Sequence, residues 1–60
     1  MKIDEVEYKL TTRYKDDLFS TINELRNGEA IRWYEAIAYR TLDGKARMCY
    51  ADETSNNWEV

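Results

Sequence analysis

Hydrophobic and polar positions alternate along residues 3–14 of the chain, near its start. Val6, Tyr8 and Leu10 are each separated from the next by one charged residue. Successive side chains of a β-strand point to opposite faces of a sheet, so a period of two predicts a strand with one buried face. We therefore predict one strand over this whole segment.

The pattern changes to a helical period over residues 15–27. Leu18, Ile22 and Leu25 recur at the spacing of one helix face. Two aspartates come just before this apolar stripe, where Asp17 can cap the helix and meet its positive end. An Asn-Gly pair follows and is a good stop signal. The segment predicts one helix of about three turns.

An Asp-Gly pair, Asp43-Gly44, lies within a stretch rich in alanine and aromatic residues. Such a pair suits a two-residue type I′ turn, which requires positive φ at both central positions. Pairing the flanking residues outward from this turn predicts a hairpin of two strands. One face of that hairpin, the bulky apolar face, carries Trp33, Ile37, Tyr39, Met48 and Tyr50.

The opposite face of the predicted hairpin carries small and basic residues. In the same register this small basic face consists of Arg32, Tyr34, Ala36, Ala38, Arg40, Arg47, Cys49 and Ala51. A slip of one residue would exchange the two faces, so the register is well specified by the pattern. It does place Arg40 directly opposite Arg47, and like charges opposed across strands are destabilising.

A helix over residues 29–42 is the alternative to the first strand of this hairpin. Ala30, Trp33, Ile37 and Thr41 belong to a stripe with helical spacing, and alanine, arginine and glutamate are good helix formers. Asp43-Gly44 would then end the helix. Tryptophan, isoleucine and tyrosine favour the strand. We prefer the hairpin and keep the helix as the alternative.

These elements predict one α+β domain over residues 1–60, of β-α-β-β order. One helix packs on one face of a mostly antiparallel three-stranded sheet. Trp58 and Val60 are candidates for a short fourth strand at the C-terminus, or Trp58 folds back over the core. The helix is expected to cover the bulky apolar face, which leaves the small basic face open.

The composition limits what can stabilise such a small chain. A domain of 60 residues buries only about 60% of the surface that its unfolded chain exposes. With one cysteine and no histidine, an internal disulfide and a zinc site are both excluded. Association with a partner or with a second copy of the chain is the remaining way to add stability.

We expect a cytoplasmic protein with no membrane segment. A single cysteine suits a reducing compartment, the N-terminal segment is too charged for a secretory signal, and no apolar run reaches the length of a membrane helix. The sequence contains no phosphate loop or catalytic motif. Cys49 has no histidine to activate it, and the adjacent acidic pairs have a solvated or capping role. We therefore expect neither enzymatic activity nor a cofactor.

The small basic face is the best candidate for a functional surface, because arginine and aromatic residues are enriched at binding hot spots. The predicted partner-binding residues are Arg32, Tyr34, Arg40, Arg47 and Trp58. We hypothesise a small protein that binds another protein stoichiometrically and occludes a site on it. An inhibitor, an antitoxin or a host-takeover factor of phage or plasmid type fits this size and this absence of chemistry.

Binding to nucleic acid is the alternative function. Arg32, Arg40, Lys45 and Arg47 would hold phosphates on a basic sheet face, in a protein that is expected to be dimeric. A net charge of −3 and a single ring, Tyr34, on that face weigh against it. A homodimer formed through the face or a sheet edge is compatible with either function.

Overall fold

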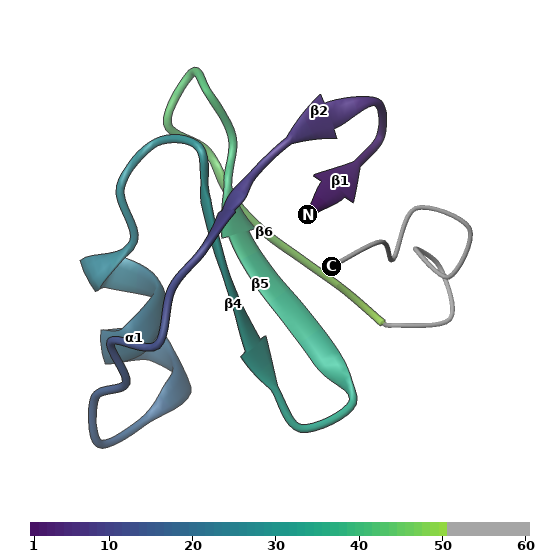
Figure 1. The fold of residues 1–60 in the computed structure, drawn as a ribbon. Helices are drawn as coiled ribbons and strands as arrows, with labels where there is room; N and C mark the ends of the chain where they lie inside the picture. Colours follow the sequence, from purple (N-terminus) through teal and green to yellow (C-terminus); the bar gives the residue numbers. More distant parts are fainter. Residues whose placement is uncertain (51–60) are drawn as a thin grey trace.

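The computed structural model describes residues 1–50, which form an α+β fold with one helix, a mixed four-stranded sheet and a separate two-stranded sheet (Figure 1). The elements in chain order are β1 (Lys2–Ile3), β2 (Val6–Glu7), β3 (Lys9–Leu10), α1 (Leu18–Glu24), β4 (Glu29–Trp33), β5 (Ala36–Arg40) and β6 (Ala46–Tyr50). The larger sheet has the order β3-β4-β5-β6, with β3 and β4 parallel and the other neighbours antiparallel. The α+β class and the β-α-β unit around the helix are confirmed. The predicted fourth strand at Trp58 and Val60 lies outside the described residues.

The prediction of one long N-terminal strand is wrong, because the chain turns back at Asp4 and Glu5. Both residues have positive φ, 50° and 70°, as the central pair of a type I′ turn requires. The turn joins β1 to β2 and places Ile3 opposite Val6. The apolar residues Met1 and Ile3 before the turn occupy odd positions, whereas Val6 and Tyr8 after it occupy even positions, so the alternation changes phase at the reversal.

The helix starts where the capping pattern predicts. The carboxylate of Asp17 accepts a hydrogen bond from the backbone N–H of Ser20 at 2.7 Å, which satisfies a free donor of the first turn. The helix is shorter than predicted, because it has seven residues and Leu25 already adopts an extended conformation. Leu25 is nevertheless buried, so the apolar stripe continues past the end of the helix.

The central segment contains two strands, so both the single long strand and the alternative helix are wrong. β4 and β5 form a hairpin in which Trp33 pairs with Ala36 across the two-residue turn Tyr34–Glu35. Tyr34 has a φ of 56° in this turn. The turn contains none of the glycine, asparagine or proline residues that usually mark a reversal.

The register of the β5–β6 hairpin differs by one residue from the prediction. Gly44 adopts a φ of 94° and donates its N–H to the carbonyl of Thr41 at 2.9 Å. Thr41 in turn donates its N–H to the carbonyl of Lys45 at 2.8 Å, and its hydroxyl accepts the N–H of Lys45. The loop therefore has three residues with glycine in the left-handed position, a common hairpin type. Tyr39 consequently pairs with Arg47.

The helix covers the face that was predicted to stay open. Ile31 and Ala38 are fully buried and form a cluster with Leu25, against which Leu18 and Ile22 pack. The prediction of an open small basic face is therefore wrong. Alanine at position 38 has little volume, so it leaves room for the helix to lie close to the sheet.

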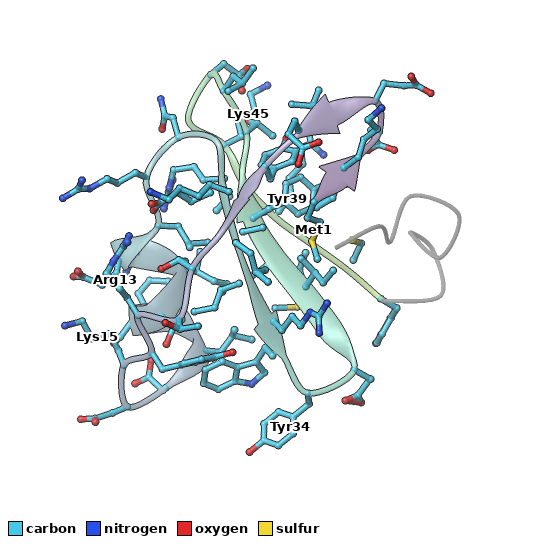
Figure 2. All side chains as sticks on the ribbon, in the orientation of Figure 1. Met1, Arg13, Lys15, Tyr34, Tyr39 and Lys45 are labelled. Carbon is cyan, nitrogen blue, oxygen red and sulfur yellow. The ribbon has the colours of Figure 1, made fainter. Side chains whose placement is uncertain are left out.

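The opposite face of the sheet is covered by the N-terminal hairpin. Ile37 and Tyr39 are buried in a cluster with Met1, Ile3, Tyr8 and Ala30. The rings of Tyr8 and Tyr39 meet edge to face, with their centroids 5.1 Å apart. Figure 2 shows Met1 and Tyr39 near each other beneath this hairpin. The central part of the sheet is thus buried on both faces.

Candidate functional site

Arg40, one of the predicted partner-binding residues, binds backbone carbonyls within the fold. Its guanidinium donates from Nε to the carbonyl of Leu25 at 2.8 Å, from Nη2 to that of Ile22 at 3.0 Å and from Nη1 to that of Gly44 at 2.9 Å. A cation at the end of a helix also meets the negative end of the helix dipole. Arg40 therefore joins the end of α1 to the loop between β5 and β6.

The other two predicted arginines lie on the opposite face of the sheet from Arg40. Arg32 pairs with Ile37, and Arg47 pairs with Tyr39 on the next strand. Directly opposed residues share a face, so Arg32 and Arg47 lie on the side of the N-terminal hairpin. The structure does not gather the three arginines into one basic surface.

Tyr34 lies at the tip of the β4–β5 turn, and Trp58 lies outside the described residues. Contact of the predicted residues with a partner stays a prediction. The structure instead brings together a different group around Tyr34, which we name the aromatic cluster. It consists of Tyr14, Lys15, Arg32, Trp33 and Tyr34, which line a shallow depression of about 280 Å³.

Trp33 contacts both of the other rings in the aromatic cluster. The ring centroids of Tyr14 and Trp33 are 6.0 Å apart, and those of Trp33 and Tyr34 are 5.9 Å apart and nearly perpendicular. Such separations are within the range of favourable aromatic pairs. Trp33 is half-buried, whereas Tyr34 is 88% exposed. Figure 2 shows Tyr34 pointing away from the sheet at the end of the turn, and Lys15 beside the start of the helix.

Hydrogen bonds hold the segment that carries Tyr14 and Lys15. The hydroxyl of Tyr14 donates to the carbonyl of Arg32 at 2.6 Å, which ties this segment to β4. The N–H of Lys15 donates to Oγ1 of Thr21 at 2.9 Å, and the Thr21 hydroxyl donates to the carbonyl of Asp17 at 2.8 Å. Thr21 is fully buried. The cluster is therefore anchored from the helix as well as from the sheet.

Arg13 anchors the same segment through a pair of charged hydrogen bonds. Its Nη2 and Nη1 donate to the two carboxylate oxygens of Glu29 at 2.6 and 3.3 Å, and Nη2 also reaches the carbonyl of Glu24 at 3.2 Å. The guanidinium of Arg13 and the N–H of Arg26 hold the pKa of the buried Glu29 below its ordinary value of 4.5. Ionised Glu29 thus holds Arg13, the residue before Tyr14 in the chain.

We expect acid to remove the contribution of Glu29 to stability. A carboxylate whose pKa is lower in the folded state than in the unfolded state stabilises the folded state. The contribution of Glu29 is complete above pH 4.5 and is lost as the pH falls through its lower, folded-state pKa. Urea unfolding measured at several pH values should show wild type losing stability in this range more steeply than Glu29→Gln, whose side chain does not titrate. Parallel pH profiles for the two proteins would contradict this role of Glu29.

A second depression, of about 450 Å³, lies between the N-terminal hairpin and the β5–β6 loop. Its lining includes Tyr8, Tyr39 and Arg47. Burial raises the pKa of both tyrosines, so their hydroxyls remain protonated at neutral pH. Both rings belong to the hydrophobic core, so we interpret this depression as a consequence of core packing.

Comparison with family models, with curated proteins and with solved structures found no match. Among residues 1–50, no three side chains of the metal-ligating types are grouped as a metal site needs. The helical structure in this part of the chain is neither long nor apolar enough to cross a bilayer. The functional argument therefore rests on the geometry of the aromatic cluster.

Sequence reasoning identified Tyr34 and Arg32 but missed Tyr14, Lys15 and Trp33 as members of one site. Adjacent residues on a strand point to opposite faces, so Trp33 and Tyr34 were assigned to different surfaces. The turn at Tyr34 removes that separation. The adjacent aromatic pair Trp33-Tyr34 is the local sequence signal for this site.

Proposed function

We propose that this protein acts by stoichiometric binding to another protein and that the aromatic cluster is the centre of the contact. The conformation of Tyr34 carries the proposal. A left-handed conformation costs a non-glycine residue about 1–2 kcal/mol, and a bulky residue in it is uncommon. Burial of the Tyr34 side chain does not offset this cost, because the side chain is almost fully exposed. Strained residues of this kind concentrate at functional sites.

The chemistry of the aromatic cluster favours a protein as the partner. Tryptophan, tyrosine and arginine are the residues that dominate binding hot spots. Trp33 already contacts the rings of Tyr14 and Tyr34, so ordering these side chains on binding costs less entropy. Acidic residues flank the cluster in the chain, Asp16 after Lys15 and Glu35 after Tyr34, and the whole chain has a net charge of −3. This mixed charge disfavours a polyanion such as nucleic acid.

The proposed mechanism is steric. The aromatic cluster docks into an apolar depression on the partner, and the rest of the small, rigid fold blocks the partner's surface around it. This mechanism requires only affinity and no reactive group. It therefore fits a chain whose sequence contains no recognisable catalytic motif.

Replacing Tyr34 by glycine is expected to weaken binding to the partner without greatly destabilising the fold. Glycine relieves the strain of positive φ but loses the ring contact with Trp33 and makes the unfolded chain more flexible, so the free energy of unfolding should change by less than about 1 kcal/mol. Loss of the ring should weaken partner binding by about 2 kcal/mol or more, which corresponds to roughly 30-fold in affinity. Urea unfolding measures the first effect, and calorimetric titration of the purified partner measures the second.

The partner itself can be obtained by affinity capture from a lysate of the source cells, with and without nuclease. We expect wild type to retain one protein after nuclease treatment and Tyr34→Gly to lose it. Phe19→Ser is a matched control, because Phe19 is exposed on α1 but does not line the depression of the aromatic cluster. Equal capture by wild type and Tyr34→Gly would refute the proposal. Capture that nuclease abolishes would instead favour nucleic-acid binding.

A further inference from the structure

β6 is an edge strand of the larger sheet within the described residues. It is the last strand in the order β3-β4-β5-β6, and within the described residues it pairs only with β5 (Figure 1). The other edge strand, β3, has two residues, whereas β6 has five in uninterrupted register, with no proline or glycine. Natural proteins usually shorten, bend or cover an edge of this kind, because it is a template for another strand.

The pairing with β5 determines which backbone groups of β6 point outward. Thr41 and Lys45 form a hydrogen-bonded pair at the hairpin loop. Hydrogen-bonded and non-hydrogen-bonded pairs alternate along an antiparallel ladder, so Arg47 bonds inward to β5. The N–H and C=O groups of Ala46 and Met48 therefore point away from β5, toward the outer edge.

The side chains next to this edge are exposed as well. Met48 pairs with Ala38 and so lies on the helix side of the sheet. Ala38 is fully buried under α1, but Met48 is 45% exposed and Ala46 is also exposed. The seven-residue helix thus covers β5 and leaves the same face of β6 accessible. A further strand beside β6 would cover Met48 and satisfy the outward backbone groups together.

We propose that this further strand is β6 of a second copy of the chain, added antiparallel about a two-fold axis at Met48. This register places Met48 opposite its equivalent and Ala46 opposite Tyr50 of the second copy, so outward-pointing groups meet each other. It also places Arg47 opposite Cys49 of the second copy. Moving the axis by one residue to Arg47 would oppose two like charges, which is destabilising. β6 is therefore complementary to itself in the register centred on Met48, as a two-fold interface requires.

The dimer joins two four-stranded sheets into one continuous sheet. Ala36, next to the β4–β5 turn, pairs with Tyr50 at one end of β6. Antiparallel addition therefore places the two aromatic clusters at opposite ends of the interface, where neither is covered. The proposal does not depend on the function of the aromatic cluster.

Analytical ultracentrifugation of the full chain over a range of concentrations tests the proposal. We expect wild type to change from the mass of one chain to that of two chains as its concentration rises. Met48→Pro removes the outward N–H while the inward ladder remains, and proline is tolerated at such an edge position. A symmetric dimer loses this N–H donor from both subunits, so the substitution should weaken association about thirtyfold or more. Met48→Leu keeps the donor and the apolar side chain and should associate like wild type.

Hydrogen exchange of wild type provides a second readout that needs no substitution. The amide protons of Ala46 and Met48 should exchange more slowly as the concentration rises. A wild type that stays monomeric, or exchange at these amides that is independent of concentration, would overturn the proposal. Dimerisation of folded Met48→Pro with the affinity of wild type would overturn it too, because another surface would then form the dimer. If a different protein protects these amides and a second copy of the chain does not, the dimer proposal is overturned and β6 is the binding edge for that protein.

Discussion

Replacing Arg40 by alanine is expected to lower the free energy of unfolding by about 3 kcal/mol, from three lost hydrogen bonds of a charged donor. The accepting carbonyls belong to Ile22, Leu25 and Gly44, which lie on two separate segments of the chain. Removal of the guanidinium leaves these acceptors without their partner and removes a cation from the negative end of the helix. A small domain is typically stable by only about 5 kcal/mol, so much of the protein should unfold at elevated temperature.

Two further variants separate the geometry of Arg40 from its charge. Arg40→Lys keeps the charge but cannot supply three donors in one plane, so an intermediate loss is expected. Arg47→Ala removes an exposed arginine on the other face and should change stability by less than about 0.5 kcal/mol. Urea unfolding followed by circular dichroism measures all three. If Arg40→Ala and Arg47→Ala lose equal stability, Arg40 does not hold the helix end.

Replacing Ala38 by glutamate is expected to prevent folding. Ala38 is fully buried between the sheet and α1, beside Ile31 and Leu25. A carboxylate placed there is too large for the space and has no partner for its charge. Burial of an unpaired charge costs several kcal/mol at least, which exceeds the reserve of a domain of this size.

Ala46→Glu is the matched control for this substitution. Ala46 lies on the same face of the sheet, on β6, but it is exposed. Its replacement should leave the circular dichroism and the dispersion of the amide NMR spectrum unchanged. A folded and equally stable Ala38→Glu protein would mean that the helix does not cover this face and that the small basic face is open after all.

The sequence predicts the helix start and the class of the fold well, because these depend on local chemistry. Asp17 caps α1 through a contact three residues away, and the stripe of Leu18, Ile22 and Leu25 packs on the sheet. The turns are predicted less well. The reversal at Tyr34 has no turn-forming residue that could mark it in the sequence.

The error in the β5–β6 register has a specific cause. The Asp-Gly pair suggests a two-residue loop, but the backbone and hydroxyl of Thr41 both bond to Lys45 and enlarge the loop by one residue. A shift of one residue exchanges the faces of a strand. It moves Arg47 to the side of the N-terminal hairpin, away from Arg40. Single hydrogen bonds of this kind are not visible in a hydrophobic pattern.

The candidate site shows the same division between local and long-range information. The sequence predicts Tyr34 as a partner-binding residue. Tyr14 joins it only because a hydrogen bond to the carbonyl of Arg32 spans segments that are 18 residues apart in the chain. The aromatic cluster is therefore a product of the fold.

The most direct test of the aromatic cluster as a binding site is an NMR titration of the isotope-labelled protein with the partner that affinity capture identifies. The amide signals of Tyr14, Lys15 and residues 32–35 are predicted to shift or broaden first, and those of the β5–β6 loop should remain in place. The Tyr34→Gly protein should show no such changes at the same partner concentration. Changes confined to the β5–β6 loop or to α1, with residues 32–35 unaffected, would contradict the account.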